Sequence, residues 1–579
     1  MTKVHFHALL PARKLESNEV VGVVGDLAQL GSWSFDQALI LTNREDGWVG
    51  TIEASQTRIR YRYFTCVVLP EALADKKLKV TCWEASAQSR LFTNSDQNDS
   101  IIKENAFESR FLEQSPLTKF TEVRVHLSSP KNAPFLKFND TYVKTFRPDL
   151  DDVYVEPETS PGCANQRLSI ITPYSHSKET VKSSMTIKVP FSSEVHATFQ
   201  LETSNLETSY IKFNILSPKK CPLGVAILSM SCLNSSKGIV RLPLLDHRFM
   251  VIGELRVPYL CIKPCLHEMS MEASCLKSWD FPTMVHVGHR GSGNSFTSEK
   301  LGNVRENSIA SFLQAGESGA AYVEFDVHLT RDGVPVVYHD LTTLIKPFQK
   351  DEGNTQLIEL PVNALTLNDL KMLRCYHKSR HNSTRKLEFN EEDFRKCNEP
   401  FPTFEELFES VPIQTGFNIE IKWPTLDENH KYEDGMKHYF DANFFVDKIL
   451  DVVCRCAKSR AIIFSSFDVD ICSMVRRKQN HYPVIFLTNG DTKHYTPLLD
   501  LRESSNKMAI GAALAEGFVG INTLDKDVYS DRSIVRKTHE ANLLFACYGD
   551  DITDRLDVIE EASVDIAIYD RIYERFPAK

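Results

Sequence analysis

The sequence has no unbroken apolar run of the roughly 18 residues that a membrane-spanning helix requires. Its most apolar stretch, from Met508 to Thr523, is shorter and contains Glu516. The first residues, Met1 to His7, lack the apolar centre of a secretory signal. We therefore expect a chain with no membrane span, located in the cytosol.

Paired cysteines are also missing. The fourteen cysteines are not clustered as in a small disulfide-rich domain, and none has the C-x-x-C spacing of a zinc site. Several lie inside apolar runs, such as Cys66, Cys82 and Cys547. This usage favours reduced thiols that pack as small hydrophobic side chains.

The sequence lacks an excess of positive charge. It has 67 lysines and arginines against 77 acidic residues, so the formal net charge is −10. This balance excludes a nucleic acid or an anionic membrane held by bulk charge, and we expect neither as a partner. A small anionic substrate would need a local basic site or a bound cation. The 579 residues suggest about three or four domains.

The first half of the chain has the pattern of β structure. Residues 1–115 hold short β-branched and aromatic runs bounded by Gly, Asn and Asp, and in one of them Arg60 and Arg62 alternate with Tyr61 and Tyr63. Residues 120–275 repeat short β-branched runs separated by Pro and Ser clusters, which is typical of a β-sandwich. No chemistry is apparent in the second segment.

The pattern changes after Asp280, where short apolar strands alternate with helical segments. Eight expected strands centre on residues 285–287, 322–325, 417–420, 462–464, 484–486, 518–521, 543–545 and 565–568. This count predicts a (β/α)₈ barrel over residues 284–575. Residues 336–338 should return as a hairpin strand, and the charged, helix-like residues 341–400 should form an inserted subdomain.

Unusual polar residues fall at the predicted carboxyl ends of the strands, where such barrels carry their active sites. Glu324 and Asp326 share one face of a strand, and Glu420 with Lys422 repeats the spacing on the next. Three carboxylates inside a barrel would repel one another unless a hard cation, Mg²⁺ or Ca²⁺, lay between them. One such acid alone would more often be part of an ion pair. The additional presence of His289, Arg290 and His339 at strand ends favours a site.

These residues resemble the glycerophosphodiester phosphodiesterase family. The matching motifs are His289-Arg290-Gly291, Glu306-Asn307-Ser308 at a helix start, residues 319–327, residues 330–340, Pro402-Thr403-Phe404 and residues 418–422. The resemblance implies that Glu324, Asp326 and Glu420 hold one divalent cation, and that His289 and His339 are the catalytic pair. It further implies that Arg290, Lys422, Glu306, Asn307 and Tyr548 contact the substrate. Tyr548 replaces a common Trp, Ser308 a common Thr, and Ile568-Tyr569-Asp570 the usual last strand ending.

Residues 1–115 are similar to a starch-binding domain. The similarity lies in Gly25 to Trp33, in Trp83-Glu84 and in Arg90. It implies that Trp33 and Trp83 stack on glucose rings of glycogen or a starch-like polymer, with Arg62 in place of a common Lys and Ser89 in place of a common Asn. Core packing of the two tryptophans is an equally weighted alternative, because Trp is highly buried on average.

The domain order resembles the cytosolic animal group of this family that acts on glycerophosphocholine. This implies hydrolysis to sn-glycerol 3-phosphate and choline. Of the two histidines, we expect His289 to act as base and His339 as acid. Three alternatives remain: a lysophospholipase D acting on a longer phosphodiester, a non-enzymatic glycogen-associated scaffold, and a glycoside hydrolase. The last would need two carboxylates but no histidine pair with a cation.

Overall fold

The computed structural model describes residues 2–10, 14–15, 18–68, 78–84, 89–93, 99–106, 111–113, 116–117, 120–128, 135–139, 153–180, 187–188, 194–265, 283–295, 304–345, 358–372, 375–376, 399–491 and 494–575. The chain divides into two compact units. One comprises Met1–Thr118, Pro264–Trp279 and Arg476–Pro483, and the other comprises Lys119–Lys263, Asp280–Val475 and Val484–Lys579. No helix in the described ranges is long and apolar enough to cross a membrane.

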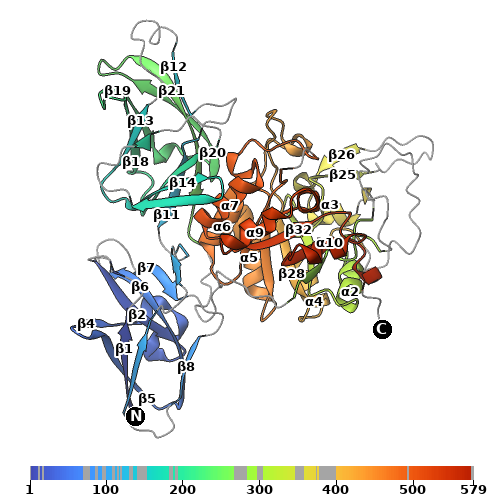
Figure 1. The fold of residues 1–579 in the computed structure, drawn as a ribbon, viewed down its shortest axis with the longest axis horizontal. Helices are drawn as coiled ribbons and strands as arrows, with labels where there is room; N and C mark the ends of the chain where they lie inside the picture. Colours follow the sequence, from blue (N-terminus) through green and yellow to red (C-terminus); the bar gives the residue numbers. More distant parts are fainter. Residues whose placement is uncertain are drawn as a thin grey trace. The chain divides into compact units, whose positions relative to one another are not determined.

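The N-terminal unit is built from two β-sheets (Figure 1). The first has the order β4-β5-β1-β9, and the second has the order β10-β7-β6-β2-β3, with β8 paired to β6. The strands are β1 (Thr2–Leu9), β2 (Glu19–Gly25), β3 (Leu39–Ile40), β4 (Thr42–Arg44), β5 (Gly47–Ala54), β6 (Arg58–Val68), β7 (Leu78–Glu84), β8 (Arg90–Thr93), β9 (Ser100–Asn105) and β10 (Phe111–Glu113). The β structure predicted for this segment is confirmed.

The middle segment forms one antiparallel sheet that curls over its own core. Its order is β15-β14-β17-β11-β21-β20-β19-β18-β13-β16, with β12 paired to β21. The strands are β11 (Thr121–His126), β12 (Leu136–Phe138), β13 (Tyr154–Thr159), β14 (Ala164–Thr172), β15 (Ser175–Thr180), β16 (Ile187–Lys188), β17 (His196–Thr203), β18 (Tyr210–Leu216), β19 (Pro222–Ser229), β20 (Lys237–Leu245) and β21 (Val251–Ile262). Buried Phe135, Phe199 and Phe213 lie in this core.

Buried ion pairs join this sheet to the barrel segment of the same unit. Arg124 on β11, 1% exposed, pairs with Glu122 at 2.6 Å and with Glu516 of the barrel segment. Lys237 on β20 pairs with Asp470 of the barrel segment at 3.2 Å. A buried charge is tolerated only with its partner in place. These pairs therefore specify one docking position of the sheet against the barrel.

Eight parallel strands close into the predicted barrel (Figure 1). The order is β22-β33-β32-β31-β30-β29-β28-β23, and β22 also pairs with β23. The strands are β22 (Val285–Gly288), β23 (Tyr322–Leu329), β28 (Gly416–Ile421), β29 (Ile462–Ser466), β30 (Val484–Leu487), β31 (Gly520–Leu524), β32 (Leu544–Tyr548) and β33 (Ile566–Tyr569). Each corresponds to one of the strands expected from the sequence. The expected hairpin return is β24 (Pro335–Val337), antiparallel to β23.

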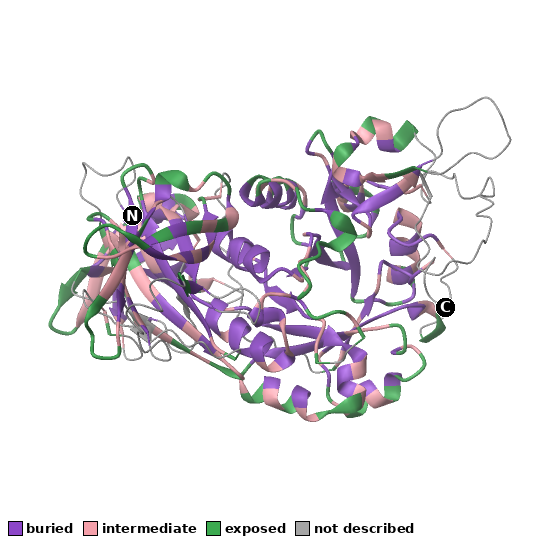
Figure 2. Cartoon of the chain, turned by 90° about the horizontal axis from the view of Figure 1, so that it is seen from above, coloured by how far each residue is buried: buried purple, intermediate pink, exposed green. Residues whose placement is uncertain are grey.

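Helices alternate with these strands and cover the outside of the barrel. They are α2 (Ile309–Glu317), α4 (Phe404–Ser410), α5 (Ala442–Cys456), α6 (Val469–Lys478), α7 (Asn506–Glu516), α8 (Asp525–Ser530), α9 (Ser533–Glu540), α10 (Leu556–Glu561) and α11 (Ile572–Arg575). All eight residues of β23 are buried. In Figure 2, the strands are coloured largely as buried, and exposed residues gather on loops and on the outer sides of helices. Phe325 of β23 points outward and packs against Phe312, Phe404 and Phe417 with ring centres 5.1–5.8 Å apart. Glu324 and Asp326 consequently face the interior.

The insertion differs from the helical character expected for residues 341–400. Its described part holds a three-stranded sheet of β25 (Thr342–Ile345), β26 (Ile358–Pro361) and β27 (Cys375–Tyr376), with one short helix, α3 (Leu367–Met372). Charge alone does not distinguish a helix from an exposed strand, because both place polar residues toward water. Residues 346–357, 373–374 and 377–398 lie outside the described ranges.

Candidate active site

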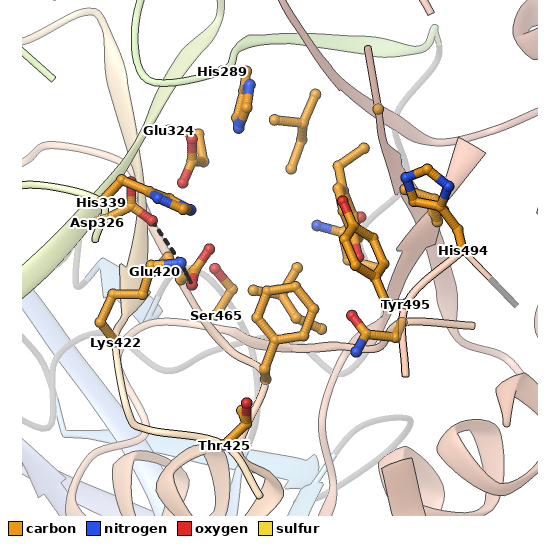
Figure 3. Close-up of a pocket in the computed structure, with 18 of the residues that line it drawn as sticks. His289, Glu324, Asp326, His339, Glu420, Lys422, Thr425, Ser465, His494 and Tyr495 are labelled. Atoms are coloured by element: carbon orange, nitrogen blue, oxygen red, sulfur yellow. Dashed lines mark ion pairs between the residues drawn. The ribbon is translucent and has the colours of Figure 1, made fainter. Parts of the chain in front are cut away.

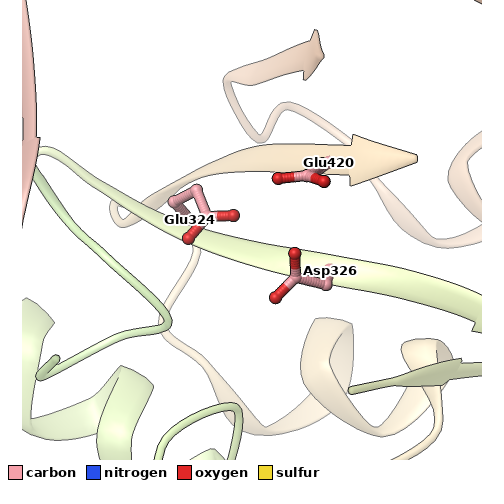
Figure 4. A group of neighbouring side chains, drawn as sticks. All are labelled: Glu324, Asp326 and Glu420. Carbon is pink, nitrogen blue, oxygen red and sulfur yellow. The ribbon is translucent and has the colours of Figure 1, made fainter. Parts of the chain in front are cut away.

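Three buried carboxylates meet on two neighbouring barrel strands (Figure 4). Glu324 and Asp326 lie two residues apart on β23, and Asp326 is in register with Glu420 on β28. One oxygen of each carboxylate lies within 4.8 Å of the others. Their exposed fractions are 5%, 1% and 8%, so water screens their repulsion poorly. The structure thus brings together the three acids that the sequence placed at one end of the barrel.

The three carboxyl groups differ in their affinity for protons. Burial, and then the neighbouring Asp326 carboxylate, raises the pKa of Glu324 to about 8. Burial raises the pKa of Glu420 to about 7, although the adjacent Lys422 ammonium opposes the rise. Burial would also raise the pKa of Asp326, but Lys422, whose Nζ lies 3.2 Å from Asp326 Oδ1, holds it well below its usual range. Two of the three acids therefore retain repulsion that their own surroundings do not relieve.

These three residues fit a bound divalent cation. Their ligand atoms are all carboxylate oxygens, which suit hard ions such as Mg²⁺ and Ca²⁺. A cation at this position would bind the deprotonated forms of Glu324 and Glu420, and it would offset both the burial and the repulsion that raise their pKa values.

Two cationic side chains border the acids. Lys422 Nζ lies 2.6 Å from Glu420 Oε1. The backbone N–H of Arg290 donates to Glu324 Oε2 at 2.9 Å, from a turn in which Arg290 has a φ of 47° and Gly291 a φ of 89°. A Cβ atom at Gly291 would lie 2.4 Å from Ser311 Oγ, so this turn requires glycine. Arg290 and Lys422 both line the pocket and can neutralise phosphate oxygens there.

Each of the two pocket histidines is held by an aspartate. His289 Nδ1 lies 2.7 Å from Asp570 Oδ1, and His339 Nδ1 lies 2.7 Å from Asp340 Oδ1. Both rings are about one-fifth exposed and line the pocket, as Figure 3 shows. An acceptor on Nδ1 fixes the tautomer and leaves Nε2 for proton transfer.

The two histidines differ in their charge state. Burial lowers the pKa of His289, but the Asp570 carboxylate outweighs this and raises it to about 9. Burial, followed by the Arg290 and Lys422 charges, lowers the pKa of His339 well below its usual range. This pattern favours His289 as the proton donor and His339 as the acceptor. It is the reverse of the assignment expected from the sequence, in which the neighbouring cations were not placed.

Glu306 and Asn307 support the site from behind rather than line the pocket, so the direct substrate contact expected of them is not found. Glu306 is 3% exposed and accepts from Arg290 Nη1 at 2.7 Å. Asn307 is also 3% exposed and donates to Asp326 Oδ2 at 3.0 Å. The motif brings them here because Ser308 caps α2 by accepting from the Ser311 N–H. Both residues therefore position Arg290 and Asp326.

The carboxylates and the two histidines line a pocket of about 990 Å³, part of which is drawn in Figure 3. His494 and Tyr495 lie across the cavity from Glu324 and His339. Tyr548 lines the pocket as expected, and its hydroxyl donates to the Thr488 carbonyl at 3.3 Å. Trp423 also lines it.

Asp570 and Asp340 each contact one of the two histidines, which the sequence did not predict. Asp570 appeared only as part of an unusual last strand ending, and Asp340 only as a charged neighbour of His339. A signal was present for Asp570, because it follows β33 directly, at the same end of the barrel as the other site residues. Its Oδ1 also accepts from the Asn294 N–H at 2.9 Å.

The carbohydrate-binding prediction requires a correction in the N-terminal unit. Trp83 and Arg62 are both 0% exposed. Trp83 packs beside Phe64 with ring centres 5.9 Å apart, and Arg62 Nη1 donates to the Glu84 carbonyl at 3.1 Å. Neither can contact a polymer in this conformation, because the second sheet packs both side chains inward. Trp33 is only partly buried and retains an exposed surface.

Comparison with known proteins agrees with this geometry. Residues 289–574 match the glycerophosphoryl diester phosphodiesterase family, residues 1–102 a starch binding domain and residues 117–266 a GDE1-like C2 domain. The chain is 34% identical to glycerophosphocholine phosphodiesterase GPCPD1 of Rattus norvegicus, over 96% of this chain and 89% of the rat protein. The Homo sapiens protein of that name gives the same identity and coverage. A putative homolog from Caenorhabditis elegans is 32% identical over 62% of this chain and 54% of its own.

Proposed function

We propose, since this chain belongs to the glycerophosphodiester phosphodiesterase family, that it hydrolyses glycerophosphocholine to sn-glycerol 3-phosphate and choline. One observation carries the proposal: the barrel holds a buried carboxylate triad between two aspartate-bound histidines at a single pocket. The relatives matched over nearly their whole length are named glycerophosphocholine phosphodiesterases, which supports the choline ester as substrate.

Each side chain of the site has its own role in the proposed hydrolysis. Arg290 and Lys422 bind the phosphodiester oxygens and balance their charge. His339, neutral in this environment, accepts the proton of the attacking hydroxyl. Attack by water gives sn-glycerol 3-phosphate directly, whereas attack by the glycerol hydroxyl next to the phosphate ester first gives a cyclic phosphate, which water then opens with the proton transfers reversed. His289 donates a proton to the choline oxygen as its bond to phosphorus breaks. When bound to Glu324, Asp326 and Glu420, a divalent cation would polarise the phosphoryl group.

The experiment that tests this function compares kcat/KM of the purified full chain on glycerophosphocholine, glycerophosphoethanolamine and glycerophosphoinositol, with the products identified. We expect choline and sn-glycerol 3-phosphate, with the choline ester at least equal to the others. A preference of tenfold or more for the inositol ester, about 1.4 kcal/mol of discrimination, would contradict the choline assignment. Lysophosphatidylcholine in the same series tests the lysophospholipase D alternative. Release of no product from any of these esters would favour the scaffold alternative.

We further propose that the N-terminal unit binds glycogen or a starch-like polymer, as its match to a starch binding domain suggests. Trp33 is the ring available for stacking, because Trp83 is buried. Cytosolic location likewise remains a prediction, for which cell fractionation is the test.

Replacing Trp33 with alanine in the full chain should abolish co-sedimentation with glycogen, since a stacked aromatic face is lost. Trp48→Ala is the matched control, because Trp48 packs against the other core of this unit. Equal co-sedimentation of the Trp33 variant and the wild type would assign Trp33 to packing alone. Melting temperatures of both variants show whether the fold is retained.

A further inference from the structure

Asp525 is a buried carboxylate on the pocket wall opposite the triad. It directly follows β31, which lies diametrically across the eight-stranded order from β23. Asp525 lines the pocket, yet its exposed fraction is 0%. His494 and Tyr495 mark the same side of the cavity in Figure 3, facing Glu324 and His339. Asp525 is therefore on the wall of the pocket that faces a ligand bound at the triad.

Neither carboxylate oxygen of Asp525 has a hydrogen-bond partner among the described residues. Asp527, two residues later in α8, gives the contrast. Its Oδ2 accepts from Asn506 Nδ2 at 2.6 Å, from Thr523 Oγ1 at 2.9 Å and from the Asp491 N–H at 3.0 Å. Asp527 is thus satisfied by the fold, whereas Asp525 is not. A buried, unpaired carboxyl is costly unless a ligand completes it.

The backbone is shaped around this carboxyl group. Leu524 of β31 is in register with Tyr548 of β32, so Asp525 lies beside Gly549 at the strand ends. A Cβ atom at Gly549 would lie 2.2 Å from Asp525 Cγ. Glycine is therefore the residue that leaves room for the carboxyl group at this wall.

The surroundings of Asp525 disfavour its charged form. Burial, and then the nearby Asp551, raises the pKa of Asp525 to about 7. The backbone N–H groups of Lys526 and Asp551 oppose this rise but make no hydrogen bond of ordinary geometry to it. The Lys526 ammonium is engaged with His494 Nδ1 at 3.1 Å.

An aromatic surface lies beside the carboxyl group. The Tyr548 ring packs edge-on against Phe467 with centres 5.9 Å apart, and both rings line the pocket. A quaternary ammonium has no N–H to donate, so it is recognised by negative charge and aromatic faces. Asp525 with Tyr548 and Phe467 supplies both.

We propose that Asp525 is the specificity-determining residue for a positively charged head group, binding the ammonium end of the substrate against Tyr548 and Phe467. This inference rests on the proposed phosphodiesterase function and adds the anionic partner of the head group. It also gives the pocket a polarity: cations at the phosphate end and an anion at the head-group end.

The test is the ratio of kcat/KM for glycerophosphocholine to that for its 3,3-dimethylbutyl analogue, in which carbon replaces the ammonium nitrogen. The wild-type ratio should be about tenfold or more, because each tenfold requires only about 1.4 kcal/mol. Asp525→Asn keeps the shape but removes the charge, so its ratio should fall toward unity while turnover of the neutral analogue persists. Asp557→Asn, which alters an exposed acid of α10 that does not line the pocket, should retain the wild-type ratio.

A ratio unchanged in Asp525→Asn would overturn the inference and leave the phosphodiesterase function intact. Wild-type protein that hydrolyses neither ester would instead contradict the function itself. If Asp525→Asn does not fold, Gly549→Ala provides the second variant, since its added methyl group displaces the carboxyl group. The ratio must fall in Gly549→Ala as well, and an unchanged ratio there would equally overturn the inference.

Discussion

Replacing Asp326 with asparagine should reduce kcat for glycerophosphocholine by about 10³-fold or more, because cation-assisted stabilisation of the transition state contributes several kcal/mol. Asp326 lies at the centre of the cluster, in register with Glu420 and 3.2 Å from the Lys422 ammonium. Glu324→Gln should have a similar effect. Steady-state turnover with saturating Mg²⁺ or Ca²⁺ measures the loss.

Glu428→Gln is the matched control, since Glu428 is an exposed acid in the loop after β28. Its turnover should equal that of the wild type. Turnover within threefold of wild type in Asp326→Asn, with the variant folded, would contradict a metal role for the triad.

Added metal should not stabilise the Asp326→Asn and Glu324→Gln variants against unfolding. In the wild type, the stabilisation by metal should depend on pH. Without metal, the folded-state pKa values of Glu324 and Glu420 are about 8 and about 7, above the ordinary value of 4.5. The folded chain thus retains protons that the unfolded chain releases, so metal-free stability falls as the pH rises through this window. Since a cation binds the deprotonated acids, it should raise the melting temperature more at about pH 8 than at about pH 5.5.

Replacing either histidine with alanine should reduce kcat by about 10²–10⁴-fold with a smaller change in KM, because each ring transfers a proton in the transition state. The two variants should respond differently to the leaving group. The p-nitrophenyl ester of glycerol phosphate releases an anion that needs no proton. His289→Ala should therefore recover most of its loss on this ester, whereas His339→Ala should not.

His539→Ala serves as the histidine control, since His539 is exposed on α9 and does not line the pocket. Recovery in His339→Ala instead of His289→Ala would restore the assignment first expected from the sequence. Wild-type turnover in both single variants would remove the histidines from the mechanism. Asp570→Asn should weaken His289 as a donor, because the carboxylate outweighs burial in raising the His289 pKa.

The barrel could be predicted from the sequence because its strands are short and mostly apolar, and helical segments separate them. Every residue of β23 and of β28 is buried, so the pattern of each strand directly reflects its position. The site followed from the same regularity, since Glu324, Asp326 and Glu420 interrupt apolar strands at one end. Parallel strands in a closed barrel bring such ends together.

The remaining features depended on contacts between residues distant in sequence. The partners His289 and Asp570 are 281 positions apart, and only barrel closure joins β22 to β33. Arg62 alternated with Tyr61 as an exposed residue would, but the second sheet of its unit is covered on both faces. The motif that contains Glu306 predicted that this residue belongs to the site, but it did not predict that Glu306 is buried behind Arg290. Alternation and motifs identify residues, whereas burial by another segment decides which of them reach the ligand.

The most direct test of metal-dependent hydrolysis is turnover of glycerophosphocholine by the full chain after its metal has been removed with a chelator and the chelator dialysed away. Release of choline and sn-glycerol 3-phosphate should stop, and Mg²⁺ or Ca²⁺ should restore it at one ion per chain. The Asp326→Asn protein, treated in parallel, should stay inactive after the same addition. Full release of choline by metal-free wild-type protein would contradict metal-dependent hydrolysis at this site.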